Sequence, residues 1–239
     1  MKNLGRYGTN QDDLSIEQRR GTDNIDLNDR LILVQSPIEQ VGQAFVQMGL
    51  VNIWKRDVYA RKIKLTAKNS LLLFQFQKPR WTIIQSSYFF PCIIQLTDAY
   101  ALLMSMWLHT KAIYYQVSDV CGYIGYHLYS DRESTETLYY EQKDFGEEGG
   151  KTYSLGENEY RLADGICYFR SKLRQIQADD IRKGYNFGYD FTDEFLKEQD
   201  AYAPSISWFR DFEIDQIVTV WVSGLERTDL ERMDYMTLI

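Results

Sequence analysis

The sequence predicts an α+β fold, a mostly antiparallel sheet with two principal helices and a C-terminal α/β extension. Short strand-like runs outnumber helical ones, and the order strand, helix, strand, strand, strand occurs in residues 31–87 and again in 89–142. No residue-level identity accompanies this order, so only the element order is repeated. The 239 residues are 44% hydrophobic, enough for one substantial core. We expect a flexible arm over 1–29 and a single domain over 30–239.

The first helix is the clearest local signal. It follows an apolar run at 31–34 and begins at Ser36 as N-cap and Pro37 as first helical residue, with Glu39 completing a capping box. Gly49 supplies a left-handed C-terminal cap. The pattern therefore predicts a helix, and then three strands separated by short turns. The helix covers 37–48 and the strands 61–66, 70–76 and 81–87, with the last turn at 78–80.

The most apolar stretch, 88–108, is long enough to span a membrane, but it carries Gln95 and Asp98 near its centre. Because a charged residue at mid-bilayer is costly, we interpret it as a buried strand followed by a helix, and we expect no membrane span. Thr97 or Asp98 can cap this helix, and its apolar character on all sides predicts deep burial. The strands expected after it are 112–117, 123–130 and 136–142.

The last third is less regular. We predict a short helix over 169–177, and the spacing of Phe191, Phe195 and Leu196 predicts another over 190–199. Strands are expected at 214–222 and 231–239, and an apolar C-terminus of this kind is typical of a strand that docks into a sheet.

Charge is distributed unevenly along the chain. Residues 1–80 hold 13 Lys and Arg against 8 Asp and Glu, so the remainder holds 27 − 13 = 14 against 34 − 8 = 26. The three cysteines lie at wide spacings without a CxxC pair, and the N-terminus has no apolar signal core. We therefore expect a cytoplasmic protein.

The segment "GEEGGKT" at 146–152 resembles a phosphate-binding loop only superficially. Three residues, not four, separate Gly146 from Gly150, and two of them, Glu147 and Glu148, would repel a polyphosphate. We expect an acidic, Gly-rich loop over 143–160 that contacts a partner protein, and no cofactor.

Three carboxylates, Asp211, Glu213 and Asp215, alternate along one face of a predicted strand. Such a set can hold Mg²⁺ or Ca²⁺, which would suit a metal-dependent hydrolase. It is more often the solvated face of an edge strand.

The segment 55–81 interleaves basic and aromatic residues, which could serve single-stranded nucleic acid through Arg61, Lys62 and Lys64. The alternative is a strand with Lys62 and Lys64 in water and Ile63 in the core. Because the net charge is −7, the overall field repels a polyanion, which argues against nucleic acid as a ligand.

The favoured hypothesis is a non-enzymatic interaction module of immunity, inhibitor or assembly-factor type. The chain has 18 Tyr but only 2 His and 3 Cys, which suits aromatic recognition better than His- or Cys-based catalysis. The partner is expected to be a protein, and acidic surface elements suit a basic one. The oligomeric state is left open. The expected contact residues are Tyr123, Tyr129, Glu147, Glu148, Tyr185, Asn186 and Tyr189.

Overall fold

The computed structural model describes residues 20–22, 28–64, 70–78, 80–86, 96–118, 122–143, 155–162, 165–175, 187–203, 217–219 and 229–239, with side chains except at 28–29, 86, 187–190 and 218–219. The elements are β1 (Asn28–Val34), α1 (Ile38–Gln47), β2 (Val51–Lys55), β3 (Lys62–Lys64), β4 (Ser70–Phe76), β5 (Thr82–Ser86), α2 (Asp98–Leu108), β6 (Ala112–Ser118), β7 (Tyr123–Ser130), β8 (Glu133–Gln142), β9 (Glu159–Arg161), β10 (Gly165–Ser171), α4 (Phe187–Glu198), β11 (Ile217–Thr219) and β12 (Leu230–Leu238).

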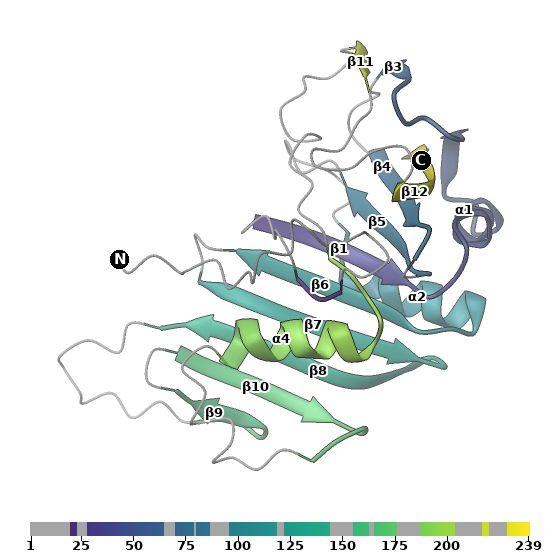
Figure 1. Ribbon diagram of the computed structural model, residues 1–239. Coiled ribbons are helices and arrows are strands. Elements are labelled where there is room, and N and C mark those ends of the chain that lie inside the picture. The colour runs from purple at the N-terminus through teal and green to yellow at the C-terminus, as the bar shows by residue number, and fades with distance from the viewer. Residues whose placement is uncertain are drawn as a thin grey trace.

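Ten of the described strands form one antiparallel sheet in the order β2-β12-β4-β5-β1-β6-β7-β8-β10-β9, and β3 pairs with β11 (Figure 1). The α+β class and its mostly antiparallel sheet are as predicted. The C-terminal strand β12 lies between β2 and β4, so the expected docking of the C-terminus is confirmed. The repeated element order stays a prediction, because 89–95 lies outside the described residues.

Both faces of the sheet are apolar, because successive side chains of a strand point to opposite sides. On one face, Ile32 and Leu73 pack with Val41 and Phe45 of α1 and Met104 of α2. The other face packs against α4, which crosses β7 and β8 (Figure 1). Burial of each such side chain contributes about 1.5–3 kcal/mol.

Helix α1 begins differently from the prediction. The first helical residue is Ile38, and Pro37 occupies the N-cap without a side-chain cap. Gln75 of β4 accepts a hydrogen bond from the Ile38 amide at 2.8 Å, while Ser36 donates to Gln40 instead. The capping box is therefore wrong, because a buried glutamine from a distant strand satisfies this helix end.

The other end of α1 is as predicted. Gly49 has φ +71°, its amide donates to Val46, and the Leu50 amide donates to Phe45. This is the Schellman arrangement that glycine permits.

Helix α2 is only half-buried, so the predicted deep burial is wrong. Ala101, Met104 and Ser105 face the core, whereas Leu103 and Trp107 are 41% and 47% exposed. The reason is that α2 contacts the sheet on one side and α1 on another, and no described element covers its outer side. None of the described helices is long and apolar enough to cross a membrane.

The C-terminal third corrects one more prediction. Residues 165–171 form β10, not the start of a helix over 169–177, because Cys167 and Phe169 alternate into the core. The helix expected over 190–199 is confirmed as α4, with Phe195 and Leu196 fully buried. The edge strands β2 and β9 were not predicted.

Candidate recognition surface

The candidate site lies on the sheet face that carries α1 and α2, where five strands run side by side. Strand register places Arg30, Gln116, Gly125, Tyr139 and Tyr168 in one row across β1, β6, β7, β8 and β10. The next row contains Ser118, Tyr123 and Glu141. Alternation along the strands brings all these side chains to one face.

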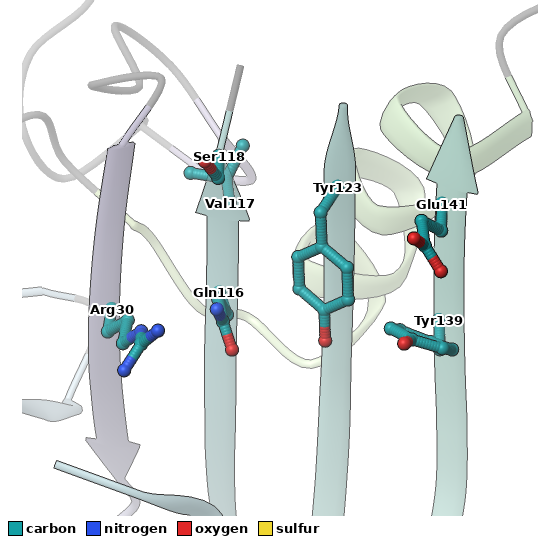
Figure 2. A pocket seen from close by; sticks show the side chains of 7 residues that line it. All are labelled: Arg30, Gln116, Val117, Ser118, Tyr123, Tyr139 and Glu141. Carbon is teal, nitrogen blue, oxygen red and sulfur yellow. The ribbon is translucent and has the colours of Figure 1, made fainter. Parts of the chain in front are cut away.

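Residues of β1, β6, β7 and β8 line a hollow of about 240 Å³, which we call the tyrosine hollow (Figure 2). This volume is below the roughly 300–1,000 Å³ of typical small-molecule sites. It suits a single side chain of a partner better than a whole metabolite. The lining residues are Arg30, Gln116, Val117, Ser118, Tyr123, Tyr139 and Glu141.

Gly125 makes room for the Tyr123 ring, which lies along its own strand (Figure 2). A Cβ at position 125 would fall 3.2 Å from the Tyr123 hydroxyl and 2.8 Å from the Leu138 carbonyl oxygen. Tyr139, opposite Gly125 on β8, meets the Tyr123 ring at a centroid distance of 4.8 Å and an angle of 63°. Edge-to-face contacts of this kind hold both rings in place. The aromatic pair is therefore formed before any partner arrives.

Within the described residues, neither the Tyr123 nor the Tyr139 hydroxyl makes a hydrogen bond. Burial raises the pKa of Tyr123, and the adjacent Tyr139 raises it further. The pKa of Tyr139 is raised by burial and by Glu141. Both hydroxyls therefore stay protonated near neutral pH and can donate to an incoming group.

Opposite charges flank the rings. On β1, Nε and Nη2 of Arg30 each donate to the side-chain amide oxygen of Gln116 at 3.2 Å. In this orientation of the Gln116 amide, its nitrogen donates to the Tyr114 hydroxyl. On β8, Glu141 accepts a hydrogen bond from Lys143. Three strand spacings, about 14 Å, separate the strands of Arg30 and Glu141. The hollow therefore has a cationic flank and a carboxylate flank.

A second polar cluster lies beside the hollow at the start of α2. The Tyr129 hydroxyl donates to Asp98 at 3.2 Å, and His127 Nδ1 lies 3.9 Å from the same carboxylate. Burial lowers the pKa of His127, although Asp98 opposes this effect. Tyr129 is 6% exposed. Of the two tyrosines expected at a contact surface here, only Tyr123 lines the hollow.

The structure describes no side chain for the other expected contact residues. Glu147, Glu148, Tyr185 and Asn186 lie outside the described residues, and Tyr189 belongs to α4 without a described side chain. They remain predictions.

The expected metal ligands Asp211, Glu213 and Asp215 also lie outside the described residues. In the part of the chain that is described, no group of three or more His, Cys, Asp or Glu side chains could hold a metal ion.

The basic residues Arg61, Lys62 and Lys64 are exposed at β3, in the small β3–β11 sheet. Ile63 between the two lysines is 4% exposed and joins the core, so the predicted alternation is confirmed. Arg61 pairs with Asp57 at 3.3 Å. Their role in nucleic-acid binding stays a prediction.

Four lining residues were not predicted from the sequence: Arg30, Gln116, Tyr139 and Glu141. One local signal could have found the last two. Asp131 and Arg132 both have positive φ and join β7 to β8 in a two-residue turn, and a tight hairpin turn sets the register of its strands. Nothing local reveals that β1 lies beside β6.

Comparison of the chain with family models, with curated proteins and with solved structures gives no match.

Proposed function

We propose that this protein is a non-enzymatic interaction module that binds a protein partner through the tyrosine hollow and acidic surface elements. The observation that supports this most strongly is the Tyr123–Tyr139 pair, which is held over Gly125 and whose hydroxyls make no hydrogen bond to any residue that the structure describes. Tyrosine provides a large contact area at a low cost in conformational entropy, and protein interfaces are enriched in it.

The chemistry of the lining favours binding over catalysis. Its charged side chains, Arg30 and Glu141, are already hydrogen-bonded to Gln116 and Lys143. Among the lining side chains described, Ser118 is the only aliphatic hydroxyl, and there is no His or Cys to activate it.

The partner is a protein with a basic surface. The chain has a net charge of −7, and complementary charge accelerates encounter with a basic protein. Glu147 and Glu148 would add to this attraction. Immunity, inhibitor and assembly-factor roles all fit such a module, and the cysteine usage favours the reducing cytoplasm.

The test compares three baits in affinity capture with quantitative mass spectrometry. They are the wild-type chain, the Tyr123→Leu/Tyr139→Thr variant, and a matched control, Tyr160→Thr. Tyr160 is a half-buried tyrosine on the opposite side of the sheet, packed against the core there. Circular dichroism and a urea midpoint establish that each bait is folded.

We expect the wild type and the Tyr160→Thr control to capture the same partner, and the double variant to lose it. The measured quantity is the ratio of captured partner between baits. Equal capture by the double variant, with its fold intact, would overturn the proposal.

A further inference from the structure

We propose that the tyrosine hollow receives the guanidinium group of an arginine from the partner, stacked on Tyr123 and paired with Glu141. This inference rests on the proposed function, since it names the group by which the partner is anchored.

The aromatic surface of the hollow has a shape that suits a guanidinium group. The Tyr123 ring lies along β7 with Tyr139 against it at 63°, so one ring forms a floor and the other a wall (Figure 2). A guanidinium is planar and weakly hydrated, and it stacks on aromatic rings better than the compact ammonium of lysine.

The carboxylate of Glu141 lies where it can pair with a guanidinium stacked on Tyr123. Glu141 is the direct register partner of Tyr123, which places their Cβ atoms about 5 Å apart on one face. A carboxylate beside a ring can accept two parallel N–H bonds from a stacked guanidinium. The Tyr123 ring and the Glu141 carboxylate can therefore contact the same guanidinium group.

The present partner of Glu141 can be exchanged. Lys143 lies two residues further along the chain, and the side chains of this pair are 34% and 35% exposed. Half-exposed pairs of this kind contribute little free energy. An incoming arginine can replace Lys143 at Glu141 at low cost.

Arg30 does not occupy this place. Its guanidinium is directed at Gln116 on β6, on the far flank of the hollow (Figure 2). Because Arg30 is positively charged, a cation is favoured only at the Glu141 side of the hollow. A cationic ligand long enough to reach both sides would be repelled by Arg30.

The fold uses the same arrangement twice within itself. Arg56 lies 3.8 Å over the Trp54 ring and donates to Glu39. Arg174 lies 5.3 Å over the Phe191 ring and donates to Glu136.

In the tyrosine hollow the ring and the carboxylate are both present, and no arginine or lysine of the described residues lies over Tyr123. An arginine of the partner would supply the guanidinium that completes this arrangement of ring, carboxylate and cation.

The test is an NMR titration of the whole chain with N-acetyl-L-arginine amide. We expect the amide resonances of Tyr123, Gly125 and Tyr139 to shift, with an affinity about 3-fold higher than for N-acetyl-L-lysine amide. Glu141→Gln should weaken arginine binding by about 3-fold. The matched control is Glu133→Gln, because Glu133 pairs with Lys172 in an exposed position away from the hollow, and it should change nothing.

Equal binding of arginine and lysine, or no effect of Glu141→Gln, would overturn the inference. Stronger shifts with adenosine would also overturn it and indicate a site for a nucleobase. If the tyrosine double variant loses the partner while arginine causes no shift, the inference fails and the proposed function stands. If arginine binds but partner capture is unchanged, the proposed function fails, and with it the assignment of this arginine to a partner.

Discussion

Arg174 donates from Nε to the carboxylate of Glu136 at 2.8 Å, and the Glu136 side chain is completely buried. The same carboxylate accepts hydrogen bonds from the Tyr126 and Ser171 hydroxyls at 2.8 and 2.6 Å. A buried charge of this kind is tolerated because its partners are all in place. Residues far apart in the chain are thereby tied together beneath α4.

Loss of the cation from this network should be costly. We expect Arg174→Met to lower the free energy of unfolding by about 3 kcal/mol, because Glu136 is left buried without its counter-charge. Urea unfolding followed by circular dichroism measures the change. The neighbouring Lys172→Met removes an exposed pair with Glu133 and should cost less than about 1 kcal/mol. Equal effects of the two substitutions would contradict the role given to Arg174.

Stability should depend on Glu39 at acid pH. Hydrogen bonds from Arg56, which has the largest effect, and from Arg232 lower the pKa of Glu39 from 4.5 to about 2. Because the folded pKa lies below the unfolded one, the stabilisation is present above pH 4.5 and is lost as the pH falls toward 2. The Glu39 side chain is 46% exposed, so solvent screening limits the effect to about 1 kcal/mol.

The measurement is the free energy of unfolding of wild type and Glu39→Gln between pH 7 and pH 2. We expect the difference between the two proteins to shrink as the pH falls, and a carboxyl titration by NMR to give a midpoint near 2. A Glu39 midpoint near 4.5 would contradict the ion pairs with Arg56 and Arg232.

Gly42 in the middle of α1 is required by a close approach. A Cβ at this position would fall 2.2 Å from Cζ2 of Trp54. That ring cannot move easily, because its Nε1 donates to Asp234 at 2.8 Å and Arg56 lies over it.

Gly42→Ala should therefore destabilise the protein by about 1–3 kcal/mol, as overpacking does. Helix propensity alone would stabilise it by about 1 kcal/mol, so the sign of the change decides between the two effects. Val46→Ala, at a 42% exposed position of the same helix, is the control and should not destabilise the protein. Thermal unfolding of the three proteins measures the difference.

The orientation of α2 can be tested with two neighbouring residues. Leu103 is 41% exposed, whereas Met104 is completely buried. Leu103→Lys should change the free energy of unfolding by less than about 1 kcal/mol, while Met104→Lys places an unpaired charge in the core and should prevent folding. Soluble yield and circular dichroism measure this. A folded Met104→Lys beside an unfolded Leu103→Lys would mean that the helix faces the other way.

The sequence predicted a structural feature correctly where that feature depends only on residues close together in the chain. Gly49 ends α1 as expected, because only the backbone next to it is involved. Phe195 and Leu196 marked the buried side of α4, and the alternation around Ile63 marked a strand with one wet face. Such periodicities depend on the geometry of a single element.

The errors have a common cause. Ile38 is capped by Gln75, and Glu39 pairs with Arg56 and Arg232, so the expected capping box gives way to partners from other elements. The apolar α2 leaves Leu103 exposed because the sheet covers one side only. The cap of Ile38, the partners of Glu39 and the exposure of Leu103 all depend on which helices and strands lie next to each other in the fold.

The sequence by itself determined the class of fold, most of its helices and strands, and the tyrosine-rich character of β7. Only the tertiary structure decided that Tyr123 lies over Gly125 between Arg30 on β1 and Glu141 on β8. The physical reason is that alternation states which side of a strand a residue faces, whereas the order of strands in a sheet depends on pairing between distant segments.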